Sequence, residues 1–177
     1  MTTSLGVTFV GRDRPGLVNA LAVAVAAAGG NWLESRLARL AGEFAGIVLV
    51  GVPATQLAAL TAALQALEQG GLHVRVEPTV SAEARRNMTI FDINLIGHDR
   101  PGIVRDVTTE LLKFGVSIEE FSTHTGSAPF AGEIMFHLAA RFAMPEESAI
   151  EELRDALERL AGEIMVDLAV KEVPEQA

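Results

Sequence analysis

Two copies of one short phrase hold the residues of this chain that are best suited to bind a charged ligand. The phrase Asp-Arg-Pro-Gly stands at Asp13–Gly16 and again at Asp99–Gly102, 86 positions later (99 minus 13). Each copy follows a strand-like run and precedes a helix-like run, so it is a strand-to-helix turn. Amides at a helix N-terminus have no intrahelical partner and attract a small carboxylate, and glycine lets that ligand approach the backbone. The turn therefore has the chemistry of a carboxylate-binding site.

The aspartate of the same turn could accept the α-ammonium group of an amino acid. We also expect the start of the adjacent second strand to bring Asn31 or Ser117 into reach, so that one turn holds both charged groups. The candidate ligand-binding residues are Asp13, Arg14, Gly16, Leu17 and Asn31 in the first copy, and Asp99, Arg100, Gly102, Ile103 and Ser117 in the second.

A purely structural interpretation of these turns is also open. Asp13 and Asp99 could cap the helices that follow, the two arginines could be solvated, and the glycines could only relieve strain. The repetition does not decide between the two interpretations, because a structural turn is duplicated together with its domain.

The repeat extends well beyond the turns and divides the chain into two halves. Gly29, Glu34 and the phrase Phe44–Gly46 reappear 86 positions later as Gly115, Glu120 and Phe130–Gly132. The series Leu57, Leu60, Leu64, Leu67 reappears as Ile150, Leu153, Leu157, Leu160, now with an offset of 93 (150 minus 57). We therefore predict a seven-residue insertion in the second copy near residues 141–147, with a loop marked by Pro145.

Each half has the pattern of strand, helix, strand, strand, helix, strand. Apolar side chains alternate with other residues over 5–9 and 91–95, which predicts half-buried strands. The helices after the turns should end at Gly29 and Gly115. The leucine series predicts a second helix in each half. The two middle strands of each half should form a hairpin, 31–40 with 44–52 turning at Gly42, and 117–125 with 130–139 turning at Gly126. The last strands should cover 72–76 and 164–170. The predicted fold class is α+β, with two ferredoxin-like domains (1–78 and 88–173), a linker at 79–87, and both helices on one face of an antiparallel sheet.

The third strand of the first copy is apolar on both faces. Val48, Val50 and Val52 align with Ile134, Phe136 and Leu138 as the predicted core face. The alternate positions Ile47, Leu49 and Gly51 are also apolar, which indicates either a strand buried on both sides or a surface that packs against another domain or subunit.

Composition and charge exclude several function classes. A net charge of −9 gives the protein no electrostatic attraction to the phosphate backbone of nucleic acid. The absence of cysteine excludes disulfides and thiolate metal sites. No apolar run is long enough to cross a bilayer. Among the four histidines, His124 and His137 could face each other across the second hairpin, but none has the spacing of a metal or catalytic site. We expect a cytoplasmic protein that is not an enzyme, has no cofactor or metal, and does not bind nucleic acid directly.

The turns and the order of elements resemble the ACT domain family, whose modules carry an Asp/Asn-Arg-Pro-Gly turn. The second-strand phrase of that family is matched by Gly29–Trp32, whereas the second copy departs from it at Gly115–Ile118. The resemblance implies an amino-acid ligand held between paired modules by the turn and the start of the second strand. The small surroundings of Gly16, Gly30 and Gly102 favour glycine or serine.

A free-standing pair of ACT domains is similar to the group of glycine cleavage system transcriptional repressors. That similarity implies action by contact with a protein such as a transcriptional activator, rather than with DNA. We also expect a homodimer, formed through sheet edges or through the apolar sheet face. A regulatory subunit of a metabolic enzyme, or a module that only assembles, are the alternatives.

Overall fold

The computed structural model describes residues 2–79, 88–127, 133–145 and 150–173. The chain divides into two compact units, Met1–Glu83 (unit 1) and Ala84–Ala177 (unit 2). No helix among the described residues is both long and apolar enough to cross a membrane.

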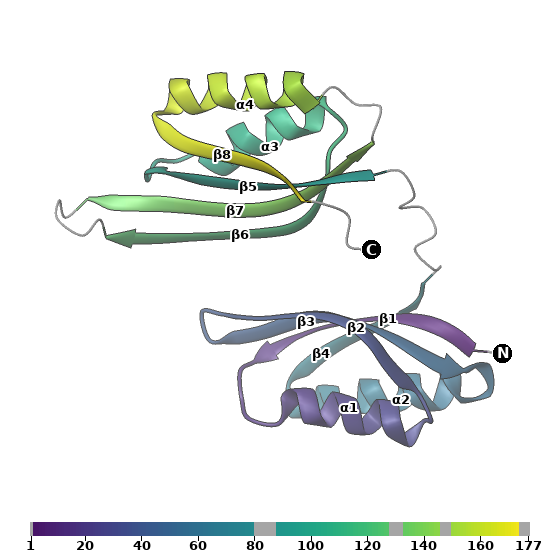
Figure 1. Cartoon of the computed structure of the whole chain (residues 1–177). Coiled ribbons are helices and arrows are strands. Elements are labelled where there is room, and N and C mark those ends of the chain that lie inside the picture. Colours follow the sequence, from purple (N-terminus) through teal and green to yellow (C-terminus); the bar gives the residue numbers. More distant parts are fainter. Residues whose placement is uncertain (1, 80–87, 128–132, 146–149, 174–177) are drawn as a thin grey trace. The chain divides into compact units, whose positions relative to one another are not determined.

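Unit 1 is a four-stranded antiparallel sheet in the order β2-β3-β1-β4. Both of its α-helices lie on one face of this sheet (Figure 1). Its elements are β1 (Thr2–Arg12), α1 (Leu17–Ala27), β2 (Asn31–Leu40), β3 (Glu43–Pro53), the 3-10 turn η1 (Ala54–Gln56), α2 (Leu57–Ala66), the 3-10 turn η2 (Leu67–Gly70) and β4 (Leu72–Pro78).

Unit 2 repeats this arrangement with the strand order β6-β7-β5-β8, again with both helices on one face (Figure 1). Its elements are β5 (Met88–His98), α3 (Ile103–Lys113), β6 (Ser117–Ser127), β7 (Ile134–Pro145), α4 (Ile150–Ile164) and β8 (Val166–Val173). The predicted α+β class and ferredoxin-like order are therefore confirmed. Ile164, predicted to begin the last strand, is instead the last residue of α4.

Each unit has its own core between the helices and the sheet. In unit 1 the alternating side chains of β1 and β3 meet the buried stripe of each helix, and unit 2 repeats this scheme. The predicted core residues Leu5, Val7, Phe9, Phe91, Ile93 and Leu95 are all buried. Gly29 and Gly115 have φ values of 63° and 65° two residues beyond their helices, so they end α1 and α3 as predicted.

The second hairpin differs from the prediction. Leu5 pairs with Val50, and its counterpart Phe91 pairs with Phe142, so β7 corresponds to β3 with an offset of 92 (142 minus 50) instead of 86. The extra six residues (92 minus 86) therefore precede β7, in the β6–β7 hairpin. The predicted insertion after this strand is wrong, because residues 141–145 belong to β7, and residues 146 and 147 lie outside the described ranges.

The predicted turn at Gly126 is wrong for the same reason. Gly126 lies within β6 and pairs with Met135, so the hairpin is longer than that of unit 1. Phe130–Gly132, which matched Phe44–Gly46 in sequence, fall outside the described residues. The counterparts of the core residues Val48, Val50 and Val52 are thus Ala140, Phe142 and Met144, all of which are buried.

Two expectations for the third strands have mixed outcomes. Phe136 and Leu138 are buried as predicted, but Ile134 is 56% exposed near the end of the longer hairpin. In unit 1, Ile47 is 59% exposed on the face opposite the helices, so β3 is not a strand buried on both sides.

Candidate ligand-binding turns

The first turn connects the end of β1 to the start of α1 and is held by the hairpin beside it. The Asp13 amide donates to the Gly42 carbonyl at 2.9 Å, which anchors the turn to the tip of the β2–β3 hairpin. Gly16 has φ 91° and is the N-cap, and its carbonyl accepts the first helical bond from the Ala20 amide at 2.9 Å. A residue with a Cβ is strained at that φ, so the turn requires glycine here. The first amides of α1 have no carbonyl acceptor within the helix.

Asp13 does not cap α1. The cap residue is Gly16 and no side chain bonds to the helix start, so the capping interpretation of this aspartate is wrong. Its carboxylate instead lies 3.7 Å from Nε of Arg39, which comes from β2. Both side chains are partly exposed, so the pair is weak and exchangeable.

Arg14 points away from this carboxylate toward the other edge of the unit. Its guanidinium donates to the Gly70 carbonyl at 3.2 Å. A Cβ at Gly70 would stand 2.7 Å from the guanidinium nitrogen, so the glycine makes room for this arginine. Arg14 therefore connects the turn to the segment before β4 and is not simply solvated.

The second turn has the same backbone geometry. The Asp99 amide donates to the Ile134 carbonyl at 2.9 Å, and Gly102 has φ 97° and caps α3 without a side-chain bond. Asp99 is therefore not a helix cap either. The two turns are the same structural device, and they differ only in the side chains around them.

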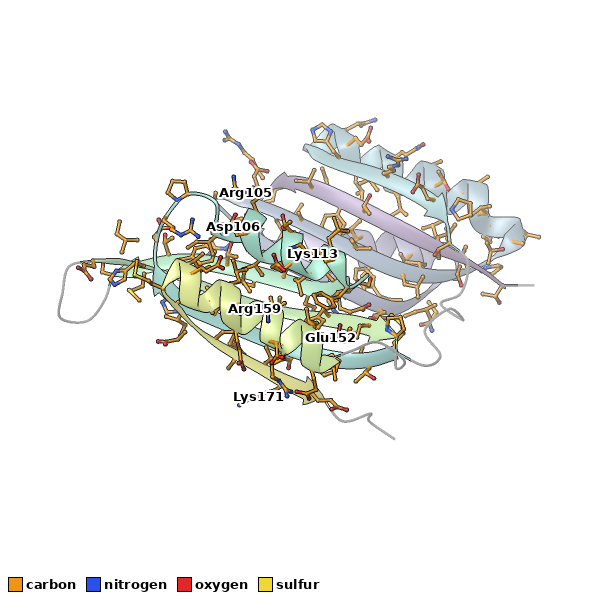
Figure 2. The ribbon with its side chains drawn as sticks, turned by 90° about the horizontal axis from the view of Figure 1, so that it is seen from above. Arg105, Asp106, Lys113, Glu152, Arg159 and Lys171 are labelled. Atoms are coloured by element: carbon orange, nitrogen blue, oxygen red, sulfur yellow. The ribbon has the colours of Figure 1, made fainter. Side chains whose placement is uncertain are left out.

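A charged cluster covers the second turn. Asp106 accepts from Arg105 at 2.8 and 2.9 Å and from Arg100 at 3.0 Å. These hydrogen bonds, from Arg105 first and then Arg100, lower the pKa of Asp106 below its ordinary value. Arg105 and Asp106 stand side by side at the start of α3 (Figure 2).

The two glycines show how differently the turns are covered. A Cβ at Gly102 would meet the Arg105 guanidinium at 3.1 Å, whereas a Cβ at Gly16 would meet nothing within 4 Å. The counterparts of Arg105 and Asp106 in unit 1 are Asn19 and Ala20, which cannot form such a cluster. The approach to the backbone is therefore open in the first turn and occupied by arginine in the second.

The sequence alone does not predict a role for three residues near the turns, Arg39, Arg105 and Asp106. The replacement of Asn19-Ala20 by Arg105-Asp106, in the first turn of otherwise matching helices, is the signal that could have identified the cluster. Arg39 has no such signal, because only the sheet register brings it to Asp13.

Asn31 and Ser117 are not brought to the turns of their own units. Asn31 pairs with Gly51, which pairs with Ser4 near the beginning of β1, whereas Asp13 follows the end of β1. The eight residue-to-residue steps from Ser4 to Arg12 extend over about 26 Å. In unit 2, Ser117 pairs with Ala143 at the corresponding end. The expectation that one turn and the adjacent strand hold both groups of one amino acid is therefore wrong within a single unit.

The side chains of Leu17 and Ile103 are buried in the cores of their units. Only their backbone amides can therefore take part in binding. The first turn thus offers free helix amides, an exposed carboxylate and an unobstructed glycine, which together suit a small zwitterion.

The histidines form no metal site in the described part of the chain. His124 and His137 do face each other across the β6–β7 hairpin, with ring centroids 4.5 Å apart and planes inclined by 3°. Nδ1 of His98 lies 3.3 Å from a Glu133 carboxylate oxygen on the surface.

Comparison with family models places both units in one family. Residues 3–77 and residues 91–158 each match a model described as ACT domain. No curated protein matches the sequence significantly.

Two solved structures are similar over nearly the whole chain. An unknown protein from Galdieria sulphuraria is 33% identical with a TM-score of 0.85, and the match covers 98% of this chain and 100% of that one. A structure named "putative glycine cleavage system transcriptional repressor" is 20% identical with a TM-score of 0.74, and the match covers 99% of both chains. The sequence repeat, the two βαββαβ units and both matches agree: this chain belongs to the ACT domain family and consists of two ACT domains in tandem.

Proposed function

We propose that this protein is an amino-acid-sensing regulator of the glycine cleavage system repressor type, which binds a small amino acid at the first turn and passes the signal by protein contact. The observation that carries the proposal is the geometry of the first turn. A Cβ at Gly16 would meet nothing within 4 Å, and Asp13 does not cap α1. The fold shared with the repressor-like structure supports the same role.

The ligand carboxylate would accept from the free amides at the start of α1, beginning with that of Leu17. Its ammonium group would replace the Arg39 guanidinium beside the Asp13 carboxylate, where the 3.7 Å separation indicates a weak existing pair. The buried Leu17 side chain offers no pocket of its own, so a ligand with a small side chain, glycine or serine, suits the turn best.

A second copy of the chain would complete the site. Asp13 and Asn31 lie at opposite ends of their sheet. One ACT domain therefore presents the ligand turn at one end and the start of the second strand at the other. A two-fold dimer can bring the turn of one copy to the second-strand start of the other. This supports a homodimer in which the ligand stabilises one packing of the pair by differential affinity.

The second turn would have a structural role. Its helix start is already covered by Arg105 and Arg100, which Asp106 holds in place. A ligand there would have to displace part of that ion-pair cluster, and Ser117 offers only a hydroxyl where the first copy has an amide. We therefore expect one functional ligand turn in each chain.

The signal would pass to a protein such as a transcriptional activator, in the cytoplasm, without direct DNA contact and without catalysis. The net charge of −9 supports a protein target over nucleic acid.

A thermal-shift screen against the common amino acids tests the proposal. A ligand at 100 times its dissociation constant adds about 2.7 kcal/mol of stability, which raises the melting temperature of a domain of this size by several degrees. We expect a rise with glycine or serine, its loss in Asp13→Asn, and its retention in the matched variant Asp99→Asn. No rise with any amino acid, or equal loss in both variants, would overturn the assignment of the first turn.

A further inference from the structure

The sheet of unit 1 has an open face, the surface opposite α1 and α2, whose centre is apolar. Val10 on β1 is 44% exposed there and Ile47 on β3 is 59% exposed, with Leu49 beside it. Leu33 and Leu40 add two exposed apolar side chains from β2, at 49% and 79%. Large side chains exposed together on one face indicate a surface that another molecule covers.

Charged residues border this centre in two adjacent rows that cross the strands. One row is acidic at both ends, because Glu34 on β2 is in register with Leu49, Gly6 and then Glu77 on β4. The next row is basic at both ends, because Arg36 is in register with Ile47, Thr8 and then Arg75. Within the chain the charges already pair along each edge, at 3.2 Å for Arg36–Glu34 and 2.9 Å for Arg75–Glu77.

We infer that the open face of unit 1 binds the same face of a second copy of this chain, about a two-fold axis that crosses the strands between the acidic and the basic row. Rotation about this axis places each copy's acidic row over the partner copy's basic row. Glu34 then faces the second copy's Arg36 at one edge, and Glu77 faces the second copy's Arg75 at the other. The apolar centres meet at the same time, with Leu49 of one copy against Ile47 of the second.

The charge pattern selects this axis over the other one that could pair the two faces. An axis parallel to the strands would exchange the two edges and place Glu34 over Glu77 and Arg36 over Arg75. Like charges that face each other disfavour such an arrangement, whereas the crossing axis makes every facing pair attractive. The face is therefore complementary to itself in one orientation only.

Residue size agrees with the crossing axis. The row that contains Ser4 and Gly51 is placed over the second copy's row of Val10 and Ala45. Ser4 thus lies opposite the larger Val10, which allows the side chains of the two sheets to interdigitate.

The area of the face predicts how tight the dimer is. Four strands over about eight residues measure roughly 19 by 26 Å, which is about 500 Å² per copy and about 1,000 Å² in total. Specific interfaces of standard size bury about 1,200–2,000 Å², so this one lies below that range, among the weak interfaces. We expect dissociation in the micromolar range.

The open face of unit 2 is not suited to the same contact. The positions of Ile47 and Leu49 are taken by Ala139 and Arg141, and Arg141 forms a bidentate pair with Asp92 at 2.9 and 3.1 Å. The centre of that face therefore carries an ion pair where unit 1 is apolar. This pair also raises the pKa of Arg141.

Sedimentation velocity of the full chain, over protein concentrations of about 1–200 μM in the absence of any amino acid, tests the inference. We expect Ile47→Glu to weaken the dimer by about 100-fold, because it would bury a carboxylate in the apolar centre. The matched control is Val23→Glu, at a side chain that is 58% exposed on α1 of the same unit, and its dimer constant should be unchanged. A monomeric wild-type chain, or equal effects of the two variants, would overturn the proposal.

Charge reversal tests the axis. Glu34→Arg should weaken the dimer about tenfold because it would face Arg36 of the second copy, and adding Arg36→Glu to the same chain should restore it. An axis parallel to the strands predicts the opposite sign for Glu34→Arg, since the new arginine would face Glu77. Tightening by Glu34→Arg would therefore refute the crossing axis.

This interface does not rest on the proposed ligand. It is measured without amino acids, so a dimer that binds none would leave it intact and contradict only the sensing role. A protein that binds an amino acid as a monomer would contradict this interface and the site shared between two copies, but it would leave the sensing role itself intact.

Discussion

The register of β7 leads to a sharp contrast between two of its residues. The structure buries Phe142 completely, with its ring 5.5 Å from that of Phe91 and the planes inclined by 24°, whereas Ile134 is 56% exposed. Alignment of the two repeats at a constant offset of 86 gives Ile134 a core position instead. Substitution of each residue by alanine therefore decides which register the strand has.

The expected magnitude follows from burial. Removal of a buried phenylalanine ring loses about 2–3 kcal/mol of transfer free energy, and the remaining cavity adds about 1–2 kcal/mol. We expect Phe142→Ala to lower the free energy of unfolding of unit 2 by about 4 kcal/mol. Ile134→Ala should change it by less than about 0.5 kcal/mol, as for other exposed sites.

Urea denaturation followed by far-UV circular dichroism measures both variants. At a slope of about 1.5 kcal/mol per molar urea, the Phe142→Ala midpoint should fall by about 2–3 M. If that variant does not fold, the milder Phe142→Leu should still lose about 1–1.5 kcal/mol. A large loss in Ile134→Ala together with a silent Phe142→Ala would refute the register and place β7 six residues earlier.

Two further predictions concern the glycine and the aspartate next to the turns. Gly11→Ala should destabilise unit 1 by about 1–3 kcal/mol because its Cβ would stand 2.6 Å from the Gly71 carbonyl oxygen, whereas Gly6→Ala, 3.9 Å from its nearest atom, should cost far less. Urea unfolding at low protein concentration, followed by the fluorescence of Trp32, the only tryptophan, measures both, and equal losses would contradict the steric argument. Because the folded pKa of Asp106 is lowered, its stabilisation is present above an unfolded pKa of about 3.9 and is lost as the pH falls further. The melting temperature of Asp106→Asn should therefore lie below that of the wild type at pH 7 and approach it near pH 3, and a constant difference across this range would show that the carboxylate charge is not the cause.

Most of the fold could be predicted from the sequence, because the same pattern of strands and helices occurs in each of the two repeats. Strand alternation and the turn glycines identify six strands and four helices in agreement with the described residues, whereas β7 is displaced at both ends and β8 at its start. The register of β7 could not be predicted, since a shift of six residues is even and leaves the same face apolar. The triplet Phe130–Gly132, which resembles Phe44–Gly46, favoured the wrong offset.

The candidate site was predicted by residue type but not by arrangement. The backbone of Asp13–Gly16 forms the expected turn at an open helix start, and the capping alternative is wrong. Proximity of Asn31 failed because α1 returns along the whole sheet and because β3 lies between β1 and β2. Comparison of the repeats shows the change of residue type at Arg105 and Asp106, but the position of the Arg105 guanidinium over Gly102 depends on side-chain conformation.

The placement of Asp13 and Asn31 at opposite ends of the sheet has a consequence for how such a regulator would respond in a cell. A site shared between copies is filled only in assembled molecules, so amino-acid affinity and subunit affinity are linked, and each must strengthen the other by the same factor. The threshold for the amino acid would then fall as the protein becomes more abundant. Expression level would thus set the sensitivity of the sensor without any change in its residues.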